Sequence, residues 1–291
     1  MKEEECDQAF VNGLPFDAHD SNCRQNPFTH VLCCEPFLNY CKNKVHPHII
    51  GGEEAPPDSF PHLARIGNKD DGIRWKCSSS IISDQFLLTA AHCLSADVAG
   101  LGCTSAKECN QVIDVEKFIK HPRYGGRKKY NDIALVRLKK KITFNSHVRP
   151  ICPYNKMDDL DERVTMTIAG WGDTETGSPS PTLRFAHLET VPLISCNASY
   201  APLVQTVLRT KFPEGITNTI YCAQGSFVEE IFSYKDACQG DSGGLLQAPS
   251  DNYPVLVGVI STGMGCGGSN PGIYTRVAAY FDWIKKTVGE F

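Results

Sequence analysis

From residue 49 onward, the chain consists of short apolar and β-branched runs separated by turn-forming residues. Clear examples are residues 86–89, 133–138, 164–169 and 255–260. Runs of this length, bounded by Gly, Pro, Asn and Ser, are typical of β-sandwiches and β-barrels. One segment, residues 277–288, has helical spacing of its apolar side chains. The pattern predicts an all-β domain with a C-terminal helix.

Residues 1–48 differ from the rest, since they are rich in Cys, Asn, Pro and His and have no sustained period. The whole chain has 14 cysteines in 291 residues, which favours an oxidising compartment and a disulfide framework. Residues 197–199 form an Asn-Ala-Ser glycosylation sequon at Asn197, consistent with secretion. Residues 1–5 are charged and lead into no apolar run, so we expect the natural start, with a signal peptide, to lie upstream.

Charge and hydropathy exclude two classes of partner. The formal net charge is −4, which provides no basic surface for nucleic acid. The basic stretches at residues 127–129 and 139–141 are short, and we interpret them as solvated charges of a loop and a strand end. No apolar run approaches the roughly 20 residues that span a bilayer. The cysteines also lack the repeated Cys-x-x-Cys spacing of a zinc site.

Three short segments carry side chains that can cooperate in covalent chemistry. They place His92 after a predicted strand, Asp132 at the start of another, and Ser242 in a glycine-rich turn. A serine hydroxyl becomes a strong nucleophile when a neighbouring base takes its proton. Histidine suits that base, and a buried carboxylate would hold its tautomer. Backbone N–H groups of Gly240 and Ser242 would then stabilise an oxyanion.

Each segment alone also has an ordinary structural explanation. A histidine can sit in a turn, an aspartate can cap a strand, and a glycine-rich turn can simply be tight. Their joint occurrence in the order His, Asp, Ser favours catalysis. A chain of the same fold that has lost its nucleophile is disfavoured because all three side chains are present.

The segments LTAAHC (88–93), NDIALVRL (131–138) and DACQGDSGG (236–244) resemble the signature blocks of chymotrypsin-like serine proteases. The resemblance covers residues 49–291 and implies a trypsin-like fold of two six-stranded antiparallel β-barrels with the active site between them. The interval from His92 to Asp132 is short for this family, so we expect a trimmed strand or loop in the first barrel.

The same resemblance places Asp236, six residues before the nucleophile, at the base of the primary specificity pocket. Ser261, Gly263 and Gly272 would line its walls, and the two glycines would leave room for a long side chain. A carboxylate at the base pairs with a guanidinium or ammonium group. The resemblance therefore predicts cleavage after Arg or Lys.

Two residues of the pocket wall, Ser261 and Thr262, lead to further predictions. Ser261 should donate a hydrogen bond to Asp132 and help keep it ionised. Thr262 stands where relatives usually carry a large aromatic residue. The subsites beside the primary pocket should therefore be less apolar than in those relatives.

Residues 48–52, HIIGG, resemble the family's activation junction. Cleavage before Ile49 would free an α-amino group that pairs with Asp241 and orders the oxyanion loop and the pocket. The alternative is an ordinary first strand and turn. His48 stands where most relatives have Arg or Lys, so a protease with Asp236 in its pocket should activate itself poorly. An upstream protease of different specificity would then be needed.

The resemblance also implies five disulfides, which are Cys77–Cys93, Cys196–Cys222, Cys238–Cys266, Cys41–Cys152 and Cys103–Cys109. The other four cysteines resemble the last four of the six in an arthropod clip domain. Interleaved pairing would join Cys6 to Cys34 and leave Cys23 and Cys33 without their usual partners. The predicted organisation is a partial clip-like module at 1–36, a linker at 37–48 and a protease domain at 49–291.

Taken together, these features resemble the clip-domain proteases of arthropods, in particular the snake- and persephone-like group. The resemblance implies a secreted, monomeric zymogen in an extracellular cascade, either immune (Toll or melanisation) or developmental. Its partners would be a downstream zymogen, an activating protease and a serpin, and neither a cofactor nor a metal is implied. Two alternatives are a digestive protease and a catalytically silent clip-domain binding protein.

Overall fold

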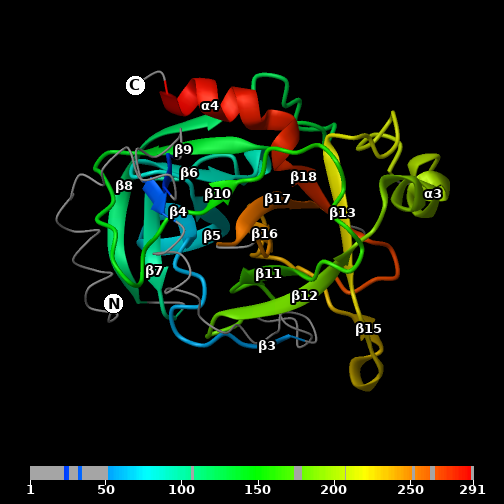
Figure 1. Ribbon diagram of the computed structural model, residues 1–291, viewed down its shortest axis with the longest axis horizontal. Coiled ribbons are helices and arrows are strands. Elements are labelled where there is room, and N and C mark those ends of the chain that lie inside the picture. The colour runs from blue at the N-terminus through cyan, green and yellow to red at the C-terminus, as the bar shows by residue number, and fades with distance from the viewer. Residues whose placement is uncertain are drawn as a thin grey trace.

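Figure 1 shows the computed structural model of the chain, which describes residues 23–25, 32–34, 52–105, 108–173, 179–206, 208–250, 253–262 and 266–289. In the N-terminal part, strands β1 (Cys23–Gln25) and β2 (Leu32–Cys34) pair in antiparallel fashion, with Cys23 opposite Cys34. The rest of the expected module at 1–36 and its linker at 37–48 lie outside the described residues, so this domain division stays a prediction.

Six antiparallel strands close into the first barrel in the order β4-β5-β6-β9-β8-β7, and β4 pairs with β7 to complete it. The strands are β4 (Leu63–Asp70), β5 (Gly72–Ile81), β6 (Phe86–Thr89), β7 (Val98–Cys103), β8 (Cys109–Lys120) and β9 (Ala134–Leu138). The short interval from His92 to Asp132 therefore removes no strand from the barrel.

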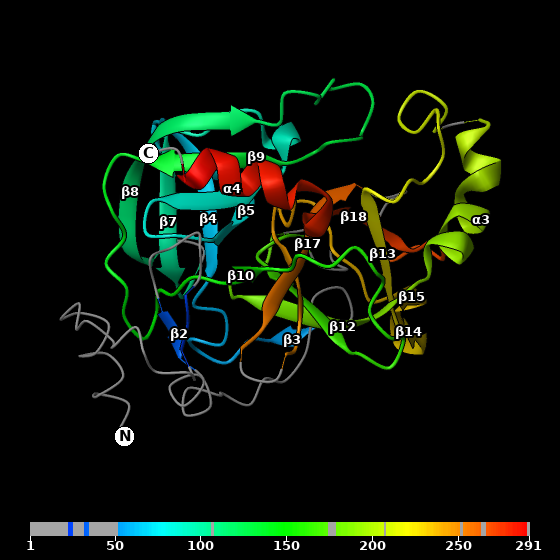
Figure 2. The ribbon, with the colours of Figure 1, turned by 45° about the horizontal axis from the view of Figure 1, so that its top comes forward.

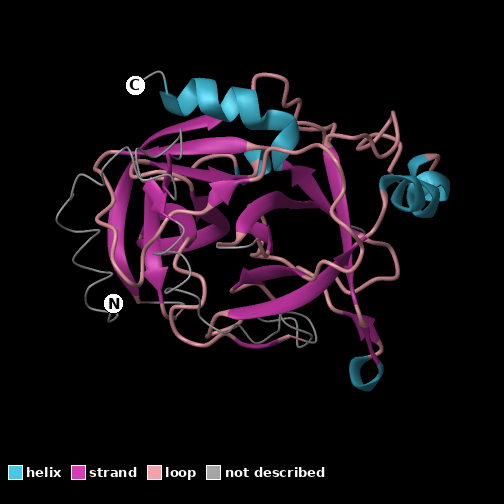
Figure 3. Ribbon diagram, in the orientation of Figure 1, coloured by secondary structure: helices cyan, strands magenta, loops and turns pink. Residues whose placement is uncertain are grey.

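The second barrel follows the order β17-β16-β11-β12-β13-β18, and pairing of β17 with β18 closes it. Its strands are β11 (Met166–Gly170), β12 (Arg184–Thr190), β13 (Ile220–Gly225), β16 (Leu245–Ala248), β17 (Val255–Thr262) and β18 (Gly272–Arg276). Two short strands pair at its edges, β3 (Glu53–Glu54) on β12 and β10 (Cys152–Pro153) on β17. Two more, β14 (Phe227–Val228) and β15 (Ser233–Tyr234), form a separate two-stranded sheet. The predicted pair of six-stranded barrels is confirmed (Figure 3).

The expected C-terminal helix is also present. It begins as a 3₁₀ turn, η3 (Val277–Tyr280), and continues as α4 (Phe281–Gly289). His121, just after β8, contacts the rings of Tyr280 and Trp283, each at 5.0 Å between centroids. The helix therefore returns from the second barrel to pack on the first (Figure 2).

A second α-helix, α3 (Leu193–Val204), was not predicted because its apolar residues lack a clear helical period. Tertiary contacts hold it instead. Cys196 forms a disulfide with Cys222, and the buried Tyr200 hydroxyl donates to the carbonyl of Pro271 at 2.6 Å. No helix in the described part of the chain has the length and apolarity to cross a membrane.

Both barrels contribute to one apolar core. Leu87 and Leu135 of the first barrel and Ile168 and Leu246 of the second are completely buried in the same cluster. A buried hydrogen bond of 2.6 Å between His62 Nε2 and Gln247 Oε1 crosses from one barrel to the other. Burial lowers the pKa of His62 to about 4, so this histidine is neutral at physiological pH.

The structure contains four of the five expected protease-domain disulfides, namely Cys77–Cys93, Cys103–Cys109, Cys196–Cys222 and Cys238–Cys266. The fifth expected pair includes Cys41, which lies outside the described residues, so the Cys41–Cys152 link stays a prediction. The pairing expected for Cys6, Cys23, Cys33 and Cys34 also stays a prediction.

Arg276 at the end of β18 is a buried cation that fastens the second barrel to the loop after β10. Its side chain is 4% exposed, and Nη2 lies 2.6 Å from Asp159 Oδ1. The guanidinium also donates to the backbone carbonyls of Ile220 and Met157, and it lies over the ring of Tyr221.

We expect Arg276→Met to lower the free energy of unfolding by about 3 kcal/mol, because it leaves a partly buried carboxylate and two carbonyls without their donor. Arg163→Met is the matched control, since Arg163 is 90% exposed and pairs with Asp161 only at the surface. Denaturant melts of both variants measure the difference. Equal stability of the two variants would contradict the structural role of Arg276.

Candidate active site

His92 lies in the short helix η1 (Ala91–Cys93), which directly follows β6. Two contacts brace this corner. The Cys77–Cys93 disulfide joins it to β5, and Thr89 Oγ1 donates to the carbonyl of Ser78 at 2.8 Å. Cys77 and Cys93 lie close enough to His92 to suggest a metal cluster, but their sulfurs are bonded to each other.

Asp132 is fully buried beside His92 and accepts three hydrogen bonds. Its Oδ2 lies 2.7 Å from His92 Nδ1 and accepts from Ser261 Oγ at 2.6 Å. Its Oδ1 accepts from the backbone N–H of His92 at 2.8 Å. The preceding Asn131 has a φ of 56°, a left-handed conformation that asparagine tolerates well.

The charge state of Asp132 follows from these contacts. Burial raises the pKa of this carboxyl, but the hydrogen bonds from His92 and Ser261 outweigh burial and lower the pKa below its ordinary value. An ionised carboxylate at this position holds the proton of His92 on Nδ1, so Nε2 is the nitrogen that can accept a proton.

Glycines shape the turn that carries Ser242. Gly240 and Gly243 have φ values of 93° and 78°, which L side chains rarely adopt. A side chain at Gly243 would also overlap Thr89 Oγ1 and the carbonyl of Ser78. The carbonyl of Ser242 accepts from Ser78 N at 2.8 Å, so the turn is fixed against β5.

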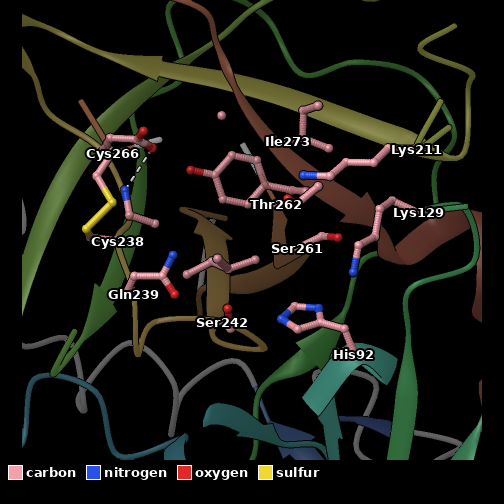
Figure 4. A pocket seen from close by; sticks show the side chains of 15 residues that line it. His92, Lys129, Lys211, Cys238, Gln239, Ser242, Ser261, Thr262, Cys266 and Ile273 are labelled. Carbon is pink, nitrogen blue, oxygen red and sulfur yellow. Dashed lines mark hydrogen bonds between the residues drawn. A yellow bond between two sulfur atoms is a disulfide. The ribbon is translucent and has the colours of Figure 1, made fainter. Parts of the chain in front are cut away.

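The backbone N–H groups of Gly240 and Ser242 stand open in this turn. Among the hydrogen bonds of the described residues, neither group donates to a protein acceptor, whereas those of Asp241 and Gly243 both do. Ser242 and His92 line the same cavity of about 340 Å³ (Figure 4). A substrate carbonyl at Ser242 would therefore meet two free donors.

Asp236 lines the same cavity. Its two oxygens accept backbone hydrogen bonds from Ala237 at 2.8 Å and from Gly267 at 3.1 Å. Burial raises the pKa of Asp236 to about 6, although these two hydrogen bonds act in the opposite direction. A Cβ added at Gly272 would lie 3.2 Å from Asp236 Oδ1, so the glycine keeps the path to the carboxylate open.

Asp241 is a second buried carboxylate, next to Ser242. Its oxygens accept from the N–H groups of Gly172 at 2.8 Å and Cys238 at 3.0 Å, and no side chain could be added at Gly172 without overlapping it. Burial raises the pKa of Asp241 to about 6. Ile49, the expected source of its positive partner, lies outside the described residues.

The charge of Asp241 also acts on a guanidinium of the first barrel, that of Arg65. Arg65 lies between the rings of Trp75 and Trp171, at 5.4 and 4.9 Å from their centroids. Burial lowers the pKa of Arg65 to about 10, while the charge of Asp241 acts to raise it. The sequence motifs gave no indication of this cation.

The structure thus brings together His92, Asp132, Ser242, Asp236 and Ser261, with Gly240, Gly272 and Asp241 beside them. Gly263 and His48 lie outside the described residues, so their expected roles stay predictions. Asn197 is exposed on α3, and its Oδ1 accepts a hydrogen bond from Ile216 N at 3.1 Å.

Two lysines that the sequence did not assign to the site also line the cavity. Lys129 and Lys211 extend into it in Figure 4. Residues 127–129 lie in a loop, as expected, and folding places Lys129 of that loop at the cleft. No local sequence signal distinguishes it from its neighbour Lys128.

Residues 49–284 match the trypsin family. The two barrels and the arrangement of His92, Asp132 and Ser242 between them agree with that match. The chain belongs to the trypsin family of serine endopeptidases.

Its relatives include proteases with clip domains. The chain is 51% identical to CLIP domain-containing serine protease C9 of Anopheles gambiae, over 97% of this chain and 80% of that protein. It is 34% identical to Serine protease snk of Drosophila melanogaster, over 82% of this chain and 57% of that protein. Phenoloxidase-activating factor 1 of Holotrichia diomphalia is 30% identical, over 82% of this chain and 70% of its own length. The expected likeness to arthropod clip-domain proteases is confirmed.

Because the pKa of Asp236 is raised, we expect the affinity of the pocket for a cation to depend on pH. Above pH 6 the carboxyl is charged and attracts a cation, and below that pH it becomes neutral. We therefore expect the dissociation constant of benzamidine, which stays cationic, to rise as pH falls, by up to about tenfold per unit. Calorimetric titration of protein cut before Ile49 measures it.

Asp236→Asn is the control for this titration. It should bind benzamidine weakly at every pH, because no carboxylate is present to ionise. A dissociation constant of the unsubstituted protein that stays constant between about pH 5 and 7 would contradict the prediction.

Proposed function

We propose that this chain is a secreted serine endopeptidase zymogen that, once cut between His48 and Ile49, cleaves polypeptides after Arg or Lys. One observation carries the specificity. The carboxylate of Asp236 lines the cavity that Ser242 and His92 also line. A half-buried carboxylate with two backbone donors but no cation among its hydrogen-bond partners in the described structure is suited to a guanidinium or ammonium group.

The reaction then follows from the positions of three side chains. Ser242 Oγ attacks the carbonyl carbon of the substrate while His92 takes the hydroxyl proton. Asp132 stabilises the imidazolium, and the N–H groups of Gly240 and Ser242 stabilise the oxyanion. His92 next gives its proton to the leaving amine, and a water molecule repeats the sequence to release the acid from Ser242.

The described hydrogen-bond donors to Asp241 are backbone N–H groups and carry no positive charge. Activation would supply a positive partner. The α-amino group of Ile49 would pair with this carboxylate, which belongs to the same turn as Ser242. Charge pairing at a buried site would order the turn and the adjacent pocket. The residue before the cut is His48, which an Asp236 pocket accepts poorly, so an upstream protease of different specificity performs the cut.

The relatives support a role in an extracellular proteolytic cascade of arthropods. They include phenoloxidase-activating factor 1 of Holotrichia diomphalia and melanization protease 1 of Drosophila melanogaster. A downstream zymogen is the proposed substrate, and a serpin is the proposed inhibitor of the monomeric enzyme. The exposed Asn197 is the proposed site of glycosylation in the secreted protein.

Paired chromogenic peptides that end in Arg or Leu test the proposed specificity. The chain is prepared with an enteropeptidase recognition sequence in place of residues 44–48, so that it can be cut before Ile49. We expect kcat/KM for the Arg peptide to exceed that for the Leu peptide by at least about a thousandfold. Ser242→Ala, cut in the same way, should lose this turnover.

A folded, correctly cut protein that cleaves neither peptide would overturn the proposal and favour a catalytically silent binding protein. Labelling by a fluorophosphonate gives an independent measure, because the reagent requires an activated serine. Preference for the Leu peptide would instead contradict the role of Asp236.

The activation bond generates a separate prediction. We expect His48→Arg to activate itself on storage at high concentration, whereas the unsubstituted zymogen stays inactive, because only Arg pairs strongly with Asp236. His48→Gln is the matched control and should also stay inactive. Appearance of the new N-terminus at Ile49 is followed by N-terminal sequencing. Equal self-activation of all three proteins would contradict the argument.

A further inference from the structure

Two lysines from different barrels enter the catalytic cavity. Lys129 belongs to the loop between β8 and β9 of the first barrel, and Lys211 to the segment between α3 and β13 of the second. Both side chains are half-buried and line the cavity with Ser242 and Asp236. In Figure 4 their ammonium groups lie on the side of Ser261 and Thr262.

The two lysine-bearing segments are fastened to each other. Lys129 N donates to the carbonyl of Lys211 at 2.9 Å. The hydroxyl of Tyr130 donates to Gly215 O at 2.8 Å and accepts from Glu214 N at 2.9 Å. The ring of Tyr130 packs edge-on against buried Phe212. The positions of both lysines therefore depend on a built contact between two loops.

The charges of both lysines are uncompensated in the described structure. Neither forms an ion pair with a described residue, whereas the adjacent Lys128 lies 3.8 Å from Glu214 and points to solvent with 60% exposure. Two ammonium groups that face one cavity repel each other, and an anion between them removes the repulsion. Thr262, at the position where relatives usually carry a large aromatic residue, also lines the cavity.

We propose that Lys129 and Lys211 form a subsite for the carboxylate of an Asp or Glu side chain that precedes the cleaved Arg or Lys of the substrate. The inference rests on the proposed endopeptidase function and adds a substrate class to it. The preferred substrate carries an acidic residue shortly before a basic one. The occupant is a polypeptide, because the lysines share their cavity with Ser242 and Asp236.

The position of the acidic residue follows from the geometry of an extended chain. Once the basic side chain reaches Asp236 and the carbonyl lies at Ser242, the preceding residues run past Ser261 and Thr262. An extended chain advances roughly 3.3 Å per residue, so the carboxylate lies within about three residues of the basic side chain. A half-buried pair of lysines should favour it by about threefold to tenfold.

Tetrapeptide substrates that end in Arg test this subsite. Glu or Gln is placed in turn at each of the three positions before Arg, with Ala elsewhere, and kcat/KM is measured on protein cut before Ile49. We expect Glu to exceed Gln by about threefold or more at one or two positions, mainly through KM. Added salt should reduce this ratio, because the lysines are only half-buried.

The lysines are tested with Lys129→Gln, Lys211→Gln and the double variant. Each should lower the Glu-to-Gln ratio, and the double variant should bring it close to one. All should still cleave the peptide with Ala at the three positions, which shows that they fold and that Asp236 still works. Lys128→Gln is the matched control and should keep the full ratio.

The possible failures are distinguishable. If no Arg peptide is cleaved, the proposed endopeptidase function is overturned. If Arg peptides are cleaved without a preference for Glu, or if Lys128→Gln lowers the ratio as much as the double variant, the subsite is overturned while the endopeptidase function stands.

Discussion

The buried carboxylate of Asp132 is the interaction on which the rest of the active site depends. It comes from the first barrel and accepts hydrogen bonds from His92 of that barrel and from Ser261 of the second. Thr275 on β18 donates to its backbone carbonyl at 2.8 Å. Removal of a carboxylate from water is costly, and the donors from His92 and Ser261 offset the cost. The contacts that keep Asp132 charged therefore also hold the two barrels together at the cleft.

Local sequence points to the proposed triad because each member lies in a short segment with its own physical requirement. Gly243 must be glycine, since its φ is positive and a side chain would overlap Thr89. The fold is harder to predict from short segments of the sequence. Alternating apolar runs predict a sandwich or a barrel, and the two six-stranded barrels followed from the family resemblance rather than from periodicity.

Contacts between distant segments explain what the sequence did not predict. The loop of Lys129 reaches the cleft because Tyr130 packs on Phe212 and donates a hydrogen bond to Gly215 O. Nothing in the sequence of residues 127–129 predicts this contact. Helix α3 is similar, since the Cys196–Cys222 disulfide and the hydroxyl of Tyr200 hold it rather than an amphipathic period. Arg65 was missed because its partners, Trp171 and Asp241, belong to the other barrel.

Two carboxyl groups with raised pKa values, Asp236 and Asp241, would connect the proposed activation with substrate binding. Burial raises the pKa of Asp236 and of Asp241 to about 6, and the charge of Asp236 contributes to the shift at Asp241. Each negative charge therefore makes the other more costly to keep. A cation beside either one lowers that cost for both, so an amino group at Asp241 and a basic side chain at Asp236 favour each other. On the proposed activation, cleavage would place a cation beside Asp241, and a basic substrate would place one beside Asp236, so each event would make the other less costly.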